Sequence, residues 1–105
     1  MLAAYTSPMS QGSVERRLRQ VTAELRQARE ELRVLDEQLV ALSDDADEAR
    51  VRALVADSPM ADKESREAQR HVDAMRRSRA ATAATITRLE HSVDELLEQF
   101  IPESR

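Results

Sequence analysis

The stretch from residue 14 to residue 42, VERRLRQVTAELRQAREELRVLDEQLVAL, decides the fold. Its apolar residues recur at alternating intervals of four and three, without a slip, through four heptads. They are Val14, Leu18, Val21, Leu25, Ala28, Leu32, Leu35, Leu39 and Leu42. This spacing puts them on one stripe of a helix and is typical of positions a and d of a coiled coil. We therefore predict a long helix that packs this stripe, here called the seam, against a second helix.

A second segment repeats the spacing further along the chain. Its seam positions are Ala68, Val72, Met75, Arg79, Thr82, Ile86, Leu89, Val93, Leu96 and Phe100. The residues that interrupt helices most strongly, Pro and Gly, stand only at Pro8, Gly12, Pro59 and Pro102. Two long helices joined near Pro59 fit this layout, and a short turn makes such helices run antiparallel. The predicted fold class is all-α, a long antiparallel coiled-coil helical hairpin.

The helix boundaries follow from residues that cap helices. We expect a flexible tail over residues 1–12, a first helix over 13–56, a turn over 57–59, a second helix over 60–101 and a tail over 102–105. Ser13 is the expected N-cap of the first helix. Ser58 is the expected N-cap of the second, followed by Pro59 at a position where the missing N–H costs nothing. Residues 13–101 are thus predicted to form a single helical hairpin domain.

The position of the turn predicts the register of the two helices. If the turn centres on Asp57, residues equally far from it face one another, and Leu25 faces Leu89. Each such pair joins an a position to a d position, as antiparallel packing requires. The same register brings Asp36 near Arg76. This pairing of opposite charges beside the seam supports the register.

Three apolar residues near the turn lie off the seam and form a stripe of their own, namely Val51, Leu54 and Val55. The preceding stretch SDDADE, residues 43–48, also has the features of a new helix start, because Asp45 and Glu48 have the spacing of a capping box. Two alternatives stay open. Either the first helix continues to residue 56, or it breaks near Ser43 and residues 45–57 form a short third helix at the tip.

The hairpin has features that favour self-association. The middle of the seam is weak, because the register puts Arg79 opposite Leu35 and Thr82 opposite Leu32. A homodimer of hairpins that forms a four-helix bundle would add apolar contacts. The candidate self-association residues are Ala80, Ala81, Ala84, Leu97 and Ile101. The alternative is a monomer in which the alanines simply favour helix.

Composition and motifs argue against several classes of function. The net charge of −4 does not favour nucleic acid, and the absence of Cys removes thiolate metal sites. No apolar run reaches the roughly 18 residues of a membrane span, and the N-terminus lacks the pattern of a signal peptide, so we expect a cytoplasmic protein. Neither His71 nor His91 has a second ligand at metal-binding spacing. We expect no catalytic, cofactor-binding or metal site, and no nucleic-acid, membrane or small-molecule partner.

An acidic cluster precedes the turn and consists of Asp44, Asp45, Asp47 and Glu48. The string LSDDAD, residues 42–47, resembles the tip of the Gre-type transcript-cleavage factors. The resemblance implies a hairpin that enters the secondary channel of RNA polymerase, where acidic residues at the tip help to hold a catalytic magnesium ion. It covers six residues, and the sequence shows no counterpart of the C-terminal polymerase-docking domain of that family. The alternative interpretation of the cluster is a helix cap or a solvated face.

The expected function is non-enzymatic. We predict a coiled-coil adaptor or scaffold that binds another protein and self-associates, with Val51, Leu54, Val55 and the acidic cluster as candidate partner-binding residues. A regulator of RNA polymerase with an acidic-tipped hairpin is the alternative. The sequence identifies neither the partner nor the pathway.

Overall fold

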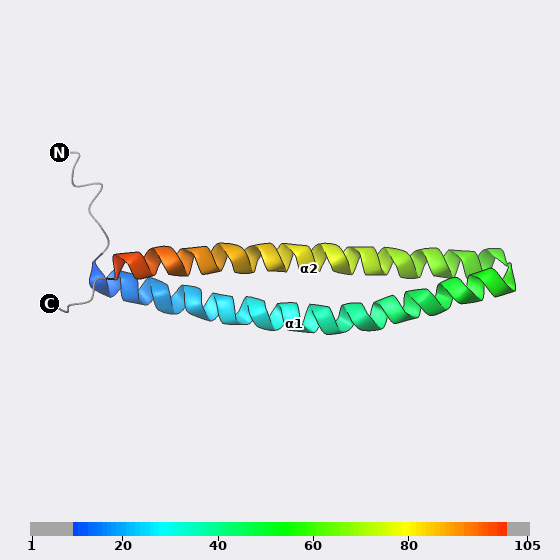
Figure 1. Cartoon of the computed structure of the whole chain (residues 1–105), viewed down its shortest axis with the longest axis horizontal. Coiled ribbons are helices and arrows are strands. Elements are labelled where there is room, and N and C mark those ends of the chain that lie inside the picture. The colour runs from blue at the N-terminus through cyan, green and yellow to red at the C-terminus, as the bar shows by residue number, and fades with distance from the viewer. Residues whose placement is uncertain (1–9, 101–105) are drawn as a thin grey trace, which may run out of the picture. The chain divides into compact units, whose positions relative to one another are not determined.

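The computed structural model describes residues 10–100, and residues 1–9 and 101–105 lie outside the described part. Helix α1 spans Gln11–Ala56 and helix α2 spans Pro59–Gln99 (Figure 1). The described residues contain no strand. The chain is therefore an all-α helical hairpin, as predicted, in which the seam of one helix lies against the seam of the other.

The chain divides into two compact units, and the first combines the start of α1, as far as Arg29, with the end of α2 from Thr85. Its buried side chains all occupy predicted seam positions: Val14, Val21, Leu25, Ala28, Ile86, Leu89 and Leu96. The spacing of these residues is therefore sufficient to explain the core of this unit. Phe100 departs from the prediction, because α2 ends at Gln99 and the Phe100 side chain is 38 % exposed.

Two polar contacts join the helices within this first unit. The side-chain amide of Gln11 donates a hydrogen bond of 3.1 Å to the backbone carbonyl of Gln99. The guanidinium of Arg29 lies 2.9 Å from the carboxylate of Glu90. One pair lies four residues short of the pairing expected from a turn at Asp57 and the other five residues beyond it, so the two contacts fall on either side of the predicted register.

The second unit comprises residues 30–84 and contains the turn. Its buried side chains are Val72, a predicted seam residue, and Ala46 and Ala49, which continue the four–three spacing of the first seam beyond Leu42. Residues 30–45 and 73–84 contain no buried side chain, and the seam leucines among them, such as Leu35 and Leu39, are only half-buried. The polar seam residue Arg79 explains why the seam is less buried here than in the first unit. Its guanidinium must reach a polar partner or water.

Arg79 finds that partner in Asp36, whose carboxylate accepts a hydrogen bond from Nε of Arg79. The expected neighbour of Asp36 was Arg76, and that prediction is wrong for the ion pair. Arg76 instead lies 3.8 Å from Asp73 on its own helix. The hydrogen bond and the negative charge of Asp36 raise the pKa of Arg79 above its usual value, so this seam position stays charged.

The first helix starts two residues earlier than predicted. The backbone N–H of Ser13 donates to the hydroxyl of Ser10 at 3.1 Å, and the N–H of Val14 donates to the carbonyl of Ser10 at 2.9 Å. Ser10 is therefore the N-cap, and Ser13 lies inside the first turn of α1. The prediction of Ser13 as the N-cap was wrong. Ser10 and Ser13 are equally good capping residues by type, and only the backbone hydrogen bonds distinguish which of them caps the helix.

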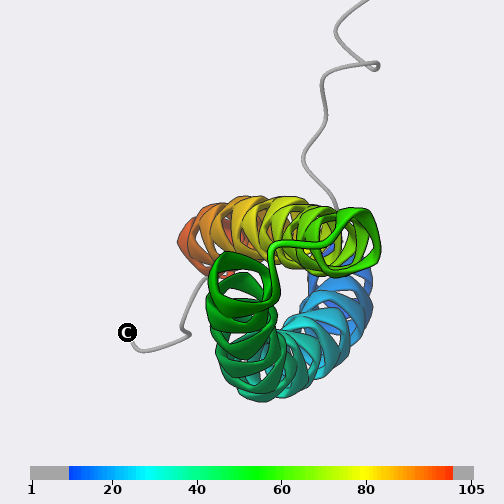
Figure 2. The ribbon, with the colours of Figure 1, turned by 90° about the vertical axis from the view of Figure 1, so that its right-hand side faces the viewer.

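The turn agrees with the predicted capping. Asp57 has a φ of 52°, the left-handed conformation that commonly ends a helix, and its N–H donates to the carbonyl of Ala53 at 3.2 Å. The hydroxyl of Ser58 then accepts a hydrogen bond of 3.1 Å from the N–H of Ala61. Ser58 thus caps α2, and Pro59 is its first residue. Figure 2 looks onto this turn from the end of the hairpin.

The first helix does not break near Ser43, and no third helix forms at the tip. Helix α1 is continuous to Ala56. Continuity keeps Ala46 and Ala49 in phase with the seam, where both are buried against α2. A break near Ser43 would expose both alanines. The helix cap that Asp45 and Glu48 could form would bury no apolar surface in exchange.

Candidate docking surface at the turn

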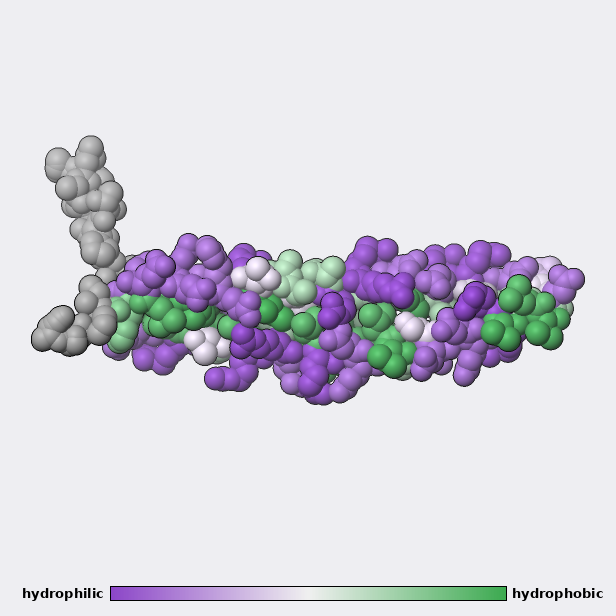
Figure 3. Space-filling model, in the orientation of Figure 1, coloured by the Kyte–Doolittle hydropathy of each residue, from purple (hydrophilic) through white to green (hydrophobic). Residues whose placement is uncertain are grey.

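The turn end of the second unit exposes four large apolar side chains, Val51, Leu54, Val55 and Met60, which we call the tip patch. Leu54 is 76 % exposed and Val55 is 80 % exposed. Val51, Leu54 and Val55 lie on the outside of α1, because they are off the seam of a continuous helix. Met60 belongs to the first turn of α2. Figure 3 shows apolar surface gathered at this end of the hairpin.

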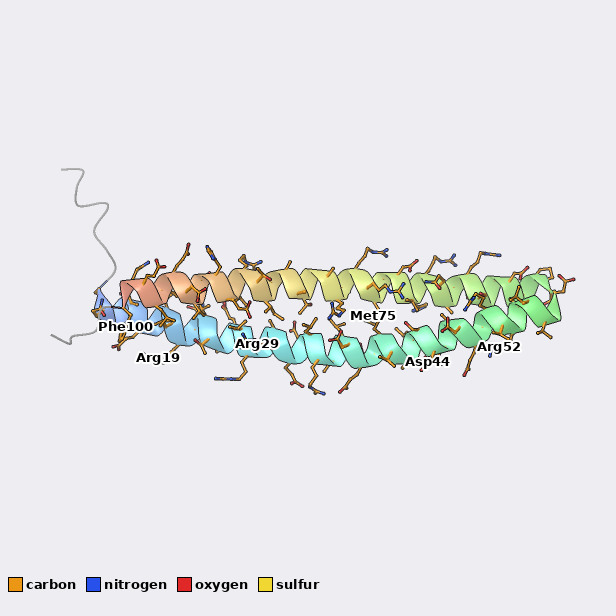
Figure 4. All side chains as sticks on the ribbon, viewed as in Figure 1. Arg19, Arg29, Asp44, Arg52, Met75 and Phe100 are labelled. Carbon is orange, nitrogen blue, oxygen red and sulfur yellow. The ribbon has the colours of Figure 1, made fainter. Side chains whose placement is uncertain are left out.

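Met60 is the member of the tip patch that the sequence analysis did not identify. Both Met60 and Met75 are most simply interpreted from sequence as seam residues. Met75 is half-buried on the side of α2 that faces α1 (Figure 4), but Met60 is 65 % exposed. The four–three spacing of the second seam, continued back from Ala68, reaches Ala61 and not Met60. This was the available signal, since adjacent helical residues point in different directions.

The acidic cluster lies on the same helix as the tip patch but further from the turn. Asp44, Asp45, Asp47 and Glu48 are all exposed. The carboxylate of Asp47 lies 3.3 Å from the guanidinium of Arg50. Within residues 10–100, no group of three or more carboxylate, imidazole or thiol side chains is close enough to hold a metal ion.

This placement bears on the resemblance to the Gre-type factors. In that family the acidic residues stand at the tip of the hairpin. Here the cluster lies inside α1, and about two and a half helical turns separate Glu48 from the turn residue Asp57. The geometry therefore adds no support to the polymerase alternative beyond the six matching residues.

Two shallow hollows lie near these features, one on α1 and one lined by both α1 and α2. One is lined by Asp47, Glu48, Val51 and Arg52, and it joins the acidic cluster to the tip patch. The other lies beside the Asp36–Arg79 pair and includes Leu39 and Val40, the latter 63 % exposed. Both hollows are open to solvent, so they suit contact with a protein surface better than enclosure of a small molecule.

The candidate self-association residues lie on the surface wherever they are described. Ala80, Ala81 and Ala84 are exposed on α2 in the second unit, and Leu97 is exposed on α2 in the first unit. Ile101 lies outside the described residues. Exposure leaves these residues accessible to a second copy, and self-association through them stays a prediction.

No protein-family model, no characterised protein and no solved structure matches the chain. Neither described helix has a stretch long and apolar enough to cross a membrane.

Proposed function

We propose that the chain is a non-enzymatic interaction module that acts in the cytoplasm and docks another protein through the tip patch. The observation that carries this proposal is the exposure of Val51, Leu54, Val55 and Met60 within two helical turns of one loop. Isolated exposed apolar residues are normal on a protein surface, but a contiguous group is a feature of interaction sites. Val51, Leu54 and Val55 lie on α1 outside its seam, so they are not needed for packing against α2.

The size of the tip patch limits what it can do alone. Complete burial of a Val, Leu or Met side chain is worth about 1.5–3 kcal/mol. Four partly exposed side chains therefore supply roughly 4–8 kcal/mol, whereas association itself costs at least about 4 kcal/mol. The partner must also contact the neighbouring surface, and the hollow lined by Val51 and Arg52 extends the patch in the direction of the acidic cluster.

The decisive variant is Leu54→Lys. Lysine has good helix propensity, and a positive charge in the last turn of α1 favours the helix, so the fold should survive. The matched control is Gln38→Lys, which adds the same charge at an exposed position of α1 away from the patch. We expect Leu54→Lys to abolish capture of the partner in an affinity pull-down from the native host, whereas Gln38→Lys retains it.

Two results would count against the proposal, and a third would call for a second variant. Equal capture by Leu54→Lys and by the wild-type chain would show that the tip patch does not bind. Loss of helicity in Leu54→Lys, measured by circular dichroism, would be tested with Leu54→Gln, which carries no charge and should also lose capture. Capture of RNA polymerase that is lost in Asp44→Ala and Asp45→Ala, but kept in Leu54→Lys, would favour the alternative regulator.

A further inference from the structure

The tip patch continues along α1 into the acidic cluster on one side of the helix. Three acidic residues and three apolar residues, which we together call the outer face, repeat the same spacing one heptad apart. They are Asp44, Asp47 and Glu48, followed by Val51, Leu54 and Val55. Because α1 is continuous, residues seven apart lie almost directly in line, about two turns along the helix. The outer face therefore has an acidic half and an apolar half.

The outer face is open to solvent along its whole length. All six side chains are exposed. The residues of α1 that are buried against α2 in this part of the helix, Ala46 and Ala49, lie on the opposite side. The whole of residues 44–55 belongs to the second unit. No element of that unit covers the outer face.

The acidic half keeps negative charge that the chain does not neutralise. Over residues 10–100, the carboxylates of Asp44 and Glu48 make neither an ion pair nor a hydrogen bond. Asp47 lies 3.3 Å from Arg50, but their side chains are 69 % and 66 % exposed, so this pair contributes little. Arg50 and Arg52 lie beside the outer face by helical position, which leaves its centre negative.

Shallow hollows lie at both ends of the acidic half. One, lined by Asp47, Glu48, Val51 and Arg52, lies where the acidic half meets the apolar half. The other includes Asp44 and Val40. Val40 stands seven residues before Asp47 and is 63 % exposed, so it shares the same side of α1. The acidic half is thus a charged band between apolar side chains.

We propose that the partner at the tip patch presents an amphipathic helix that carries Lys or Arg one heptad away from its apolar residues. This inference rests on the proposed function and adds the chemistry of the partner. Side chains at heptad spacing form the kind of surface against which a second helix packs. The apolar residues of the partner helix cover Val51, Leu54 and Val55, and its basic residues lie against Asp44 and Glu48.

The charge of the acidic half decides which helices fit. An acidic helix places carboxylates against carboxylates, and an uncharged helix removes water from Asp44 and Glu48 without supplying a partner. An anionic membrane surface is repelled for the same reason as an acidic helix. A basic helix gains charge-assisted contacts instead. The apolar half therefore supplies affinity, and the acidic half supplies selectivity.

The probe is a phage-displayed library of helical peptides of about 21 residues, or three heptads, randomised along one side. Binders are selected with the full chain. We expect the selected peptides to carry Lys or Arg seven residues from apolar positions. The tightest binder, the basic peptide, is then compared with an acidic peptide in which Glu replaces those basic residues. The wild-type chain should bind the basic peptide at least about tenfold more tightly, by a ratio that falls at about 500 mM NaCl.

Glu48→Lys is the decisive variant. Glu31→Lys is the matched control, because it makes the same charge change at an exposed position of α1 in the second unit, off the outer face. Glu48→Lys should lower the ratio at least about tenfold and should bind the acidic peptide more tightly than the wild-type chain does. Glu31→Lys should leave the ratio unchanged. A gain in affinity for the acidic peptide cannot arise from unfolding.

Several outcomes would overturn the inference. They are a library that yields no binder, selected peptides without a preference for basic residues, and equal effects of Glu48→Lys and Glu31→Lys. Docking at the tip patch would survive each of them if Leu54→Lys still abolished capture of the native partner. Selected peptides that bind Leu54→Lys as tightly as the wild-type chain would refute docking at the tip patch as well. Dimerisation of the chain that Leu54→Lys abolishes would assign the outer face to a second copy instead.

Discussion

Substitution of Val21 by alanine tests whether the seam is packed as the structure shows. The Val21 side chain has no exposed surface. Its replacement removes two methyl-sized groups from the core, worth about 1.6 kcal/mol at ~0.8 kcal/mol for each. The cavity that remains adds up to about 1 kcal/mol if the helices do not close over it. Alanine also favours helix over valine by about 0.5 kcal/mol, which acts in the opposite direction.

The net expectation is a loss of about 1–2 kcal/mol in the free energy of unfolding. Val72, which is 1 % exposed in the second unit, should behave in the same way. Val55→Ala is the matched control, because Val55 is 80 % exposed and only the helix-propensity term remains. Val55→Ala should therefore stabilise the chain slightly, by about 0.5 kcal/mol or less.

The measurement is urea unfolding followed by circular dichroism at one protein concentration. A change in the midpoint with an unchanged slope reports stability alone. Equal effects of Val21→Ala and Val55→Ala would refute the reasoning, because they would mean that the two valines are equally exposed in solution. A loss at Val72 but not at Val21 would show that only the second unit is packed as described.

Three further predictions concern the seam, the turn and the surface charges. Arg79→Leu should raise the melting temperature by several degrees, since it completes an apolar seam at the cost of one exposed ion pair, and a lower melting temperature would contradict this. Asp57→Gly should stabilise the chain by about 0.5–1 kcal/mol, because glycine adopts a φ of 52° without strain; destabilisation in urea would show that the Asp side chain itself is needed. The hydrogen bond from Arg33 and its positive charge lower the pKa of Glu30. The contribution of this pair to stability is therefore complete above the usual pKa of Glu and is lost as the pH falls through the lowered pKa. In NMR titrations, Arg33→Gln should raise the pKa of Glu30 toward its usual value, and an unchanged pKa would exclude the pair in solution.

The candidate site could be predicted from the sequence only in part. Val51, Leu54 and Val55 were recognisable because they fall outside the seam spacing, and they are exposed as a continuous helix requires. Met60 was not identified, because a difference of one residue in helix phase separates a seam position such as Ala61 from an exposed one, and the sequence analysis did not assign that phase at the start of the second helix. That phase is fixed by the cap at Ser58, whose hydroxyl accepts the N–H of Ala61.

The sequence by itself determined the two helices, the turn between them and the residues of the seam. Intervals of three and four residues place side chains on one helical stripe whatever the surroundings, and Pro59 disrupts a helix interior but fits a turn or the first turn of a helix. The tertiary structure decided whether α1 continues past Ser43. The local capping signal favours a break, and only burial of Ala46 and Ala49 against α2 outweighs it. The choice of Arg79 as the partner of Asp36 was decided in the same way, because it depends on how closely the two helices approach at a polar seam position.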